Sequence, residues 1–134
     1  PNAYEYWLYH KYRMYWLDLG DPKEVKEREI GARPHYHGSN PQDEKDFERQ
    51  MRSLFGLLSQ VVSDEGRACF VVGRSIIQGK KIDNAALLRR AANTESFELE
   101  NSVSRQIQSS SGSFNQGYSG IDDEKILVFT KEGV

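Results

Sequence analysis

The chain has 134 residues, which is enough for one hydrophobic core but no more, and its 37% hydrophobic and 28% charged residues are ordinary for a globular domain. The formal net charge of -2 gives no overall attraction to nucleic acid, so a nucleic-acid role would need a local basic patch. No apolar stretch approaches the roughly 20 residues of a membrane span, and no charged segment precedes an apolar one near the start, so we expect a cytoplasmic protein.

The first predicted element is a helix over residues 3–19. Residues 2–16 contain seven aromatic side chains, and apolar residues lie on nearly every side of a helical wheel. A helix that is apolar all round is either buried or in need of a partner. Because aromatic side chains at helical spacing are more often core residues than a stacking platform, we expect Trp7 and Trp16 to be buried.

A loop insert is predicted at about residues 20–42, interrupted by a short charged helix over Lys23–Ile30. Asp21 and Pro22 are typical of a helix start, since Asp accepts hydrogen bonds from free N–H groups and Pro suits the first turn. Residues 31–41 contain two prolines and two glycines and are expected to be an irregular surface segment.

Basic and aromatic side chains gather in this insert. The candidate nucleic-acid contacts among them are Arg28, Arg33, His35, Tyr36 and His37. They form a local patch of the kind that lies on phosphates, although a solvated loop with no partner is an equal alternative. His35 and His37 could share a metal with His10, but no cysteine or suitably spaced carboxylate completes a ligand set, so we expect no metal.

The clearest predicted helix begins at Asp43 and ends at the turn over residues 64–66. Its apolar residues recur on one face at helical spacing. They are Phe47, Met51, Leu54, Phe55, Leu58, Val61 and Val62.

A strand is predicted next, over Arg67–Gly73. The segment is short, continuous and rich in β-branched and aromatic residues, which is typical of an interior parallel strand covered on both faces. Its Cys69 is the only cysteine and cannot form an internal disulfide; we expect it to be buried and inert.

The remaining elements are a helix over residues 82–93, a strand over residues 97–107 and a last strand over residues 125–130. Between the two strands, residues 109–120 contain five serines and three glycines, a composition that stays flexible unless a partner orders it. The order of helices and strands predicts an α/β fold.

Several of these segments, taken in order, resemble the C-terminal half of the DNA amino-methyltransferases, which methylate adenine N6 or cytosine N4. The aromatic run over residues 2–16 resembles the stretch after the family's Asp/Asn/Ser-Pro-Pro-Tyr catalytic loop. Val62–Arg67 stands where the family has a Leu-Lys-Pro-Gly-Gly turn, and Glu124–Lys131 is similar to its closing antiparallel strand. The resemblance implies that residues 1–134 are the C-terminal portion of a class I, Rossmann-like methyltransferase domain, with a mixed sheet and a C-terminal antiparallel strand.

Two motifs of that family do not occur in this sequence: the Pro-Pro-Tyr loop, which would stand just before Pro1, and the glycine-rich turn that receives S-adenosylmethionine. The resemblance therefore implies S-adenosylmethionine as the cofactor of a full-length parent, with no cofactor expected to bind this chain alone. No catalytic residue is assigned here. The loop both positions the target amino group and stabilises the transition state, so we expect the isolated chain to be inactive.

Half of a target-base pocket could remain. Gly73, Arg74 and Ser75 follow the predicted strand and would face the cleft at the carboxyl ends of the sheet. Phe114 and Tyr118 stand where the resemblance implies a ring that stacks on the flipped base. The alternative for each ring is a loop anchor that packs on the domain.

The resemblance implies DNA as the partner of the parent protein. It also implies a further strand beside Arg67–Gly73, contributed by the missing N-terminal half; without it we expect self-association across an exposed strand edge. Two alternatives stay open: a non-catalytic methyltransferase-like module that uses Arg33, His35 and Tyr36 to bind nucleic acid or protein, and an ordinary α/β domain. The choice between adenine and cytosine also stays open.

Overall fold

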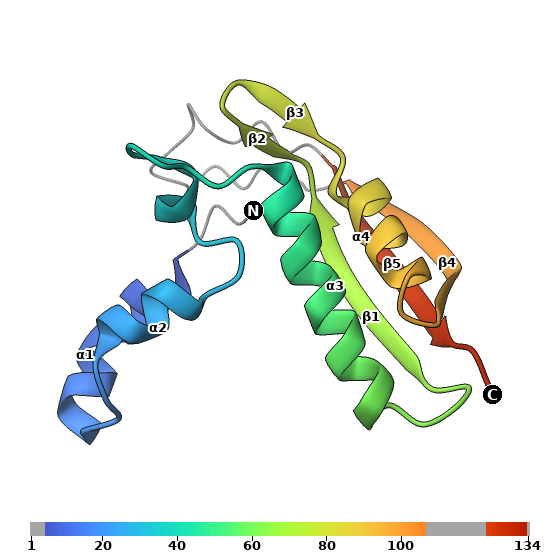
Figure 1. Ribbon diagram of the computed structural model, residues 1–134, viewed down its shortest axis with the longest axis horizontal. Helices are drawn as coiled ribbons and strands as arrows, with labels where there is room; N and C mark the ends of the chain where they lie inside the picture. Colours follow the sequence, from blue (N-terminus) through green and yellow to red (C-terminus); the bar gives the residue numbers. More distant parts are fainter. Residues whose placement is uncertain (1–4, 107–122, 134) are drawn as a thin grey trace.

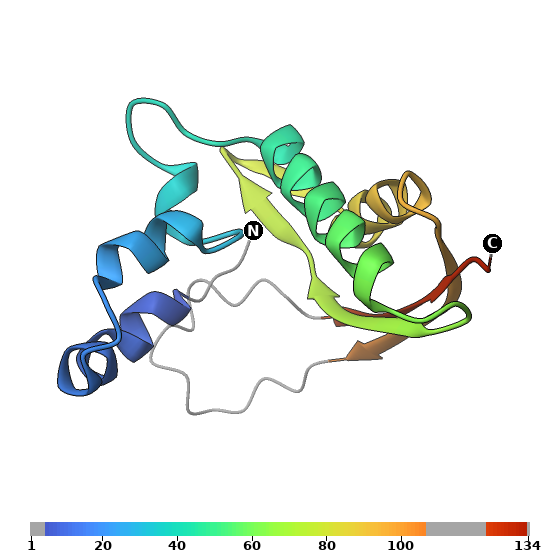
Figure 2. The same ribbon diagram turned by 60° about the horizontal axis from the view of Figure 1, so that its bottom comes forward.

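The computed structural model describes residues 5–106 and 123–133. Its elements in chain order are α1 (Tyr6–Leu17), α2 (Pro22–Arg28), the 3-10 turn η1 (Arg33–Tyr36), α3 (Glu44–Val61), β1 (Arg67–Gly73), β2 (Ser75–Ile77), β3 (Lys80–Ile82), α4 (Asn84–Asn93), β4 (Phe97–Gln106) and β5 (Asp123–Lys131). Helices α3 and α4 lie against the sheet, whereas α1 and α2 form a pair to one side of it (Figures 1 and 2). The predicted order of helices and strands is confirmed, with one hairpin added.

The main sheet has the strand order β1-β5-β4. Both neighbouring pairs are antiparallel, so β1 and β4 run in the same direction with β5 inserted between them. Helix α4 makes the crossover that connects two strands of the same direction. The predicted α/β fold with a C-terminal antiparallel strand is therefore confirmed.

Helix α3 starts where local sequence signals place its beginning. The Asp43 carboxylate accepts hydrogen bonds from the backbone N–H groups of Lys45 and Asp46, and the Asp46 carboxylate accepts one from the Asp43 N–H. This reciprocal capping box satisfies donors that the first turn leaves free. The predicted apolar face is buried at Phe47, Met51 and Phe55, but Val61 at the end of the helix is 71% exposed, contrary to the prediction.

The hydrophobic core lies between the two helices and one face of the sheet. Its centre is a cluster of four phenylalanines, in which the Phe55 ring lies 5.2 Å from Phe70, 5.5 Å from Phe97 and 5.2 Å from Phe129, measured between centroids. Tilted and edge-on ring pairs at this spacing are favourable beyond their burial. The cluster joins α3 to all three strands of the main sheet.

Strand β1 is not the interior strand that the sequence predicts. It is the terminal strand of the described sheet, and its side chains alternate between half-buried (Ala68, Phe70) and exposed (Cys69, Val71). Successive side chains of a strand point to opposite faces, and the helices cover only one of them here. Cys69 is consequently exposed, not buried as expected.

The prediction that Trp7 and Trp16 are both buried is also wrong. Met14 is the buried residue of this helix, Trp7 is half-buried and Trp16 is 88% exposed. The physical reason is that α1 packs on α2 with one side. The Glu29 carboxylate, directly after α2, also accepts hydrogen bonds from the backbone N–H groups of Tyr6 and Trp7. The opposite side of α1 faces solvent.

The added hairpin pairs β2 with β3. Its two-residue turn has positive φ at both Gln78 (50°) and Gly79 (79°), the conformation of a type I′ turn that suits strand twist. Strands of only three residues show too little alternation to be recognised in a sequence. The hairpin includes Ile82, so α4 begins two residues later than predicted. The Asp83 carboxylate caps α4 by accepting hydrogen bonds from the N–H groups of Ala85 and Ala86.

Candidate functional site

The C-terminal end of β1 turns a corner that is fixed from α4. Strand β1 ends at Gly73, β2 begins at Ser75, and Arg74 stands between them. The Asn84 side-chain amide donates to the Gly73 carbonyl oxygen over 2.8 Å and to Ser75 Oγ over 2.6 Å. Since Asn84 is only 6% exposed, these bonds are sheltered from water and hold the corner in one conformation.

Three strand ends meet at this edge of the sheet. Gly73 lies opposite Glu124 in the β1–β5 register, and Gln106 lies opposite Asp123 in the β4–β5 register. The carboxyl ends of β1 and β4 are therefore on the same side as the corner, which is where α/β sheets bind ligands. The chain leaves β4 and re-enters β5 here; Phe114 and Tyr118 belong to that connection and lie outside the described residues.

Charged groups of both signs surround the corner. Arg74 Nε is 3.8 Å from the Asp123 carboxylate, and Arg105 pairs with Glu124 one register position further along the edge. A small hollow beside Gly73 is lined by Arg74, Asp83 and Asp123 among others. The Arg74 side chain remains 65% exposed, so it can reach a ligand above the edge without breaking a buried contact.

The predicted nucleic-acid contacts divide between surface and core. Arg28, Arg33 and His37 are exposed and His35 is half-buried. Arg28 faces Glu24 at 3.9 Å, but both side chains are so exposed that this pair is screened by solvent. The side chains of Arg28, at the end of α2, and of Arg33 and His37, between α2 and α3, are thus accessible.

Tyr36, which the sequence analysis groups with the nucleic-acid contacts, is a core residue. It is 6% exposed and belongs to the main hydrophobic cluster. Burial, followed by the nearby Asp46 and Asp43 carboxylates, raises the pKa of Tyr36 to about 12. Tyr36 is buried because η1 turns the chain back toward the start of α3. The Gln42 N–H donates to the His35 carbonyl oxygen at this turn.

Sequence reasoning did not find Asn84 or Asp123. Asn84 falls inside the segment predicted as helix, and the bonds it makes to Gly73 and Ser75 depend on a corner that the sequence does not show. Asp123 precedes the predicted start of the last strand. The one usable signal was Asp83, a helix-capping residue type directly before Asn84.

Metal ligands do not cluster in the part of the chain that the structure describes: no three His, Cys, Asp or Glu side chains there lie together in a way that would hold an ion. Within the same ranges, no helix combines the length and apolarity needed to cross a membrane.

No protein-family model matches the sequence, and no curated protein matches it. Among solved structures, the fold is similar to that of a protein from Thermus thermophilus that is provisionally described as a DNA modification methylase, with a TM-score of 0.51 and 16% sequence identity. The match covers 67% of this chain and 38% of the other, so the chain spans little more than a third of that protein. At this identity the likeness shows only that the two proteins share part of an α/β fold, and it leaves the activity open.

The described residues do not fit S-adenosylmethionine as they stand. Strand β1 ends at Gly73 and is followed by Arg74 and Ser75 instead of a glycine-rich turn. The Asp83 carboxylate beside the hollow is already used to cap α4, and Arg74 is opposed by Asp123.

Proposed function

We propose that residues 1–134 form the C-terminal portion of a DNA amino-methyltransferase domain, which transfers a methyl group from S-adenosylmethionine to adenine N6 or cytosine N4. The observation that carries the proposal is the sheet edge at Gly73: the carboxyl ends of β1 and β4 meet there, in a fold similar to part of a protein described as a DNA modification methylase. The fold alone does not define an activity, which is why the site has to support it.

In this proposal the chain supplies the side of the cleft that receives the target base. Gly73, Arg74 and Ser75 form the floor of a target-base pocket, and Phe114 and Tyr118 supply stacking rings. The exposed Arg28, Arg33 and His37 lie on phosphates. The binding site for S-adenosylmethionine and the Pro-Pro-Tyr loop come from the complementary portion of the domain, since neither the glycine-rich turn nor the Pro-Pro-Tyr motif occurs in this sequence.

A methyl-transfer assay tests the proposal. We expect no label on duplex DNA when the isolated chain is incubated with labelled S-adenosylmethionine, and transfer of label when the complete open reading frame around these residues is used. In that complete protein, Arg74→Ala should reduce transfer, while Arg89→Ala on the exposed side of α4 should leave it unchanged. Label transferred by the isolated chain would overturn the division of roles, and an inactive complete protein would overturn the function.

A second candidate function is a non-catalytic module that binds nucleic acid. The observation that favours it is the exposure of Arg28, Arg33 and His37, which can contact phosphates without any catalytic group. A gel-shift titration of the chain with duplex DNA over a salt series addresses it, because phosphate contacts predict a steep loss of affinity with salt. Salt-dependent binding together with an inactive complete protein would favour this module.

The proposal also bears on β1. Its outer edge pairs with no strand in the described sheet, and a methyltransferase domain would place a further strand there. We infer that the isolated chain self-associates through this edge, as exposed strand edges do. Light scattering after size exclusion should show a mass above that of one chain; a stable monomer at high concentration would contradict the inference.

A further inference from the structure

The outward side of α1 carries an aromatic surface, which we define as Tyr9, Tyr12, Arg13 and Trp16. The three rings are 64%, 71% and 88% exposed, respectively. Positions 9, 12 and 16 are spaced i, i+3 and i+7, so they share one face of a helix. That face is opposite Met14, the buried residue of α1.

The helix that presents these rings is held at both ends. At its start, the Glu29 carboxylate accepts from the Tyr6 and Trp7 N–H groups over 2.9 Å and 3.1 Å. At its end, Asp18 adopts the left-handed conformation and the Leu19 N–H donates to the Met14 carbonyl oxygen. Lys26 Nζ also lies 5.2 Å from the centre of the Trp7 ring. The α1 aromatic surface is thus presented by an ordered helix.

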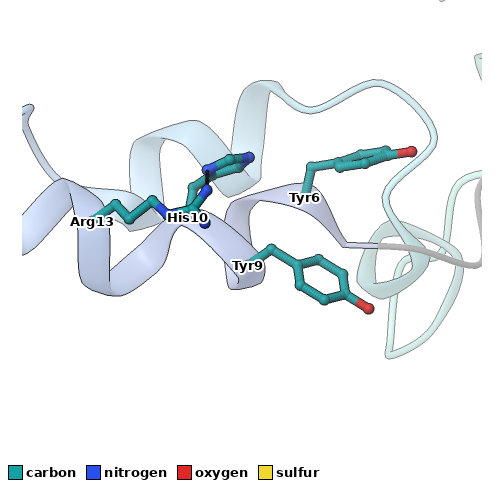
Figure 3. A pocket seen from close by; sticks show the side chains of 4 residues that line it. All are labelled: Tyr6, Tyr9, His10 and Arg13. Atoms are coloured by element: carbon teal, nitrogen blue, oxygen red, sulfur yellow. Dashed lines mark hydrogen bonds between the residues drawn. The ribbon is translucent and has the colours of Figure 1, made fainter.

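The charge of α1 is of one sign. Between Tyr6 and Leu17 the helix contains Lys11, Arg13 and His10 but no Asp or Glu, although the whole chain has a formal net charge of -2. Arg13 donates to His10 Nδ1 over 3.3 Å, and both side chains line an open hollow together with Tyr6 and Tyr9 (Figure 3). Exposed rings beside exposed cations suit an anionic partner that offers flat aromatic groups.

We propose that the α1 aromatic surface stacks unpaired bases of a single-stranded or locally opened nucleic acid, with Arg13 and Lys11 on its phosphates. A helix rises about 1.5 Å per residue, which spaces the successive rings by about 4.5 and 6 Å along the axis. This exceeds the spacing of about 3.4 Å between stacked nucleotides of one strand, so the rings match bases that have left the stack. Stacking on exposed rings with flanking cations is the usual way of holding single strands.

This inference deepens the proposed function and rests on it for nucleic acid as the partner. Bases inside a duplex have their faces covered, so the surface should prefer single strands. A second copy of this chain is a weaker match, because a surface with cations and no carboxylates gains little from a partner with a net charge of only -2.

The test is a binding titration of the full chain with a labelled eight-nucleotide oligothymidylate and with a duplex of the same length, followed by fluorescence anisotropy. We expect the single strand to bind more tightly and to quench the fluorescence of Trp16. Trp16→Leu and Tyr12→Ala should each weaken binding about fivefold or more, the effect of losing one stacked base. Ile76→Ala, a change at a 68% exposed residue of β2, is the matched control and should leave the affinity within twofold.

Unchanged affinity of both α1 variants would overturn the inference. If a duplex still binds in a salt-dependent manner that needs Arg28 or Arg33, the proposed function survives that result. A fall in molecular mass for Trp16→Leu without any loss of oligonucleotide binding would also overturn it, since the surface would then join two copies of the chain. Circular dichroism of each variant confirms that an observed loss is not a loss of folding.

Discussion

The side-chain amide of Asn84 donates a hydrogen bond to the Gly73 carbonyl oxygen over 2.8 Å, and this contact ties the first turn of α4 to the C-terminal end of β1. The same amide reaches Ser75 Oγ, so one buried side chain determines how the chain leaves the strand and enters the hairpin. Arg74 is carried between these two attachment points, and its placement depends on Asn84.

Replacing Asn84 should therefore destabilise the fold. Asn84→Ala leaves a sheltered carbonyl oxygen without a donor, and we expect it to lower the free energy of unfolding by about 1–3 kcal/mol. Urea denaturation measures the change. Asn93→Ala, at the exposed C-terminal end of the same helix, is the control and should stay within about 0.5 kcal/mol; equal stability of the two variants would contradict the role of Asn84.

The contact between Arg67 and Glu100 predicts a dependence of stability on pH. Hydrogen bonds from Arg67 and then Thr130 lower the pKa of Glu100 to about 2. A carboxyl whose folded pKa is depressed stabilises the fold above its unfolded pKa and loses that effect as the pH falls through the folded value. Wild type should thus melt at a higher temperature than Glu100→Gln near neutral pH.

The difference in melting temperature between wild type and Glu100→Gln should close as the pH falls from about 4.5, the ordinary pKa, toward about 2. Scanning calorimetry at a series of pH values measures it. Glu98→Gln, at an exposed position in the same strand, is the matched control for the loss of one surface carboxylate. A constant difference between wild type and Glu100→Gln across this range would contradict the assignment.

We expect the largest loss of stability from a single substitution in the phenylalanine cluster. Phe55 is fully buried and its ring meets those of Phe70, Phe97 and Phe129. Phe55→Ala should lower the free energy of unfolding by about 3–5 kcal/mol, because it removes buried apolar surface and leaves a cavity. Leu57→Ala, on the 56% exposed side of the same helix, should change it by about 0.5 kcal/mol or less.

Substitutions at two neighbouring residues of the turn between α3 and β1 should change the stability of the fold in opposite directions. Glu65 has φ of 62°, a left-handed conformation that glycine adopts more readily, so Glu65→Gly should stabilise the fold by roughly 0.5 kcal/mol. An added Cβ at Gly66 would lie 2.6 Å from the Ser63 carbonyl oxygen; Gly66→Ala should destabilise by about 1–3 kcal/mol. Chemical denaturation that showed the same sign for both would contradict this geometry.

Local signals explain which elements the sequence predicts. Helix α3 combines an apolar face with a capping residue at Asp43, and both signals lie within the helix itself. The main strands are likewise long enough to show their pattern. The β2–β3 hairpin has strands of three residues each, which is too short to show a pattern. Its turn at Gln78 has no sequence feature that sets it apart from other turns.

Burial depends on parts of the chain that are distant in sequence, and most wrong predictions concern burial. Trp16 and Cys69 have the residue types of a core, yet nothing among the described residues covers them. Tyr36 lies in a proline-bounded segment typical of a surface loop, but η1 turns its ring inward. Gly73 was correctly predicted as the end of a strand, but the corner that follows it and Asn84, which fixes that corner, could not be identified without the fold.

The most direct measurement is an amide NMR titration of the 134-residue chain with a short duplex that contains one mismatched adenine, a base that is easily extracted from the stack. If this chain is the base-receiving side of a methyltransferase-like fold, the largest shifts should fall at Gly73, Arg74 and Ser75, with a second group at Arg33 and His37. These shifts should weaken with added salt and be lost at the corner in Arg74→Ala. Binding that leaves the corner unshifted, or no binding at low salt, would contradict it.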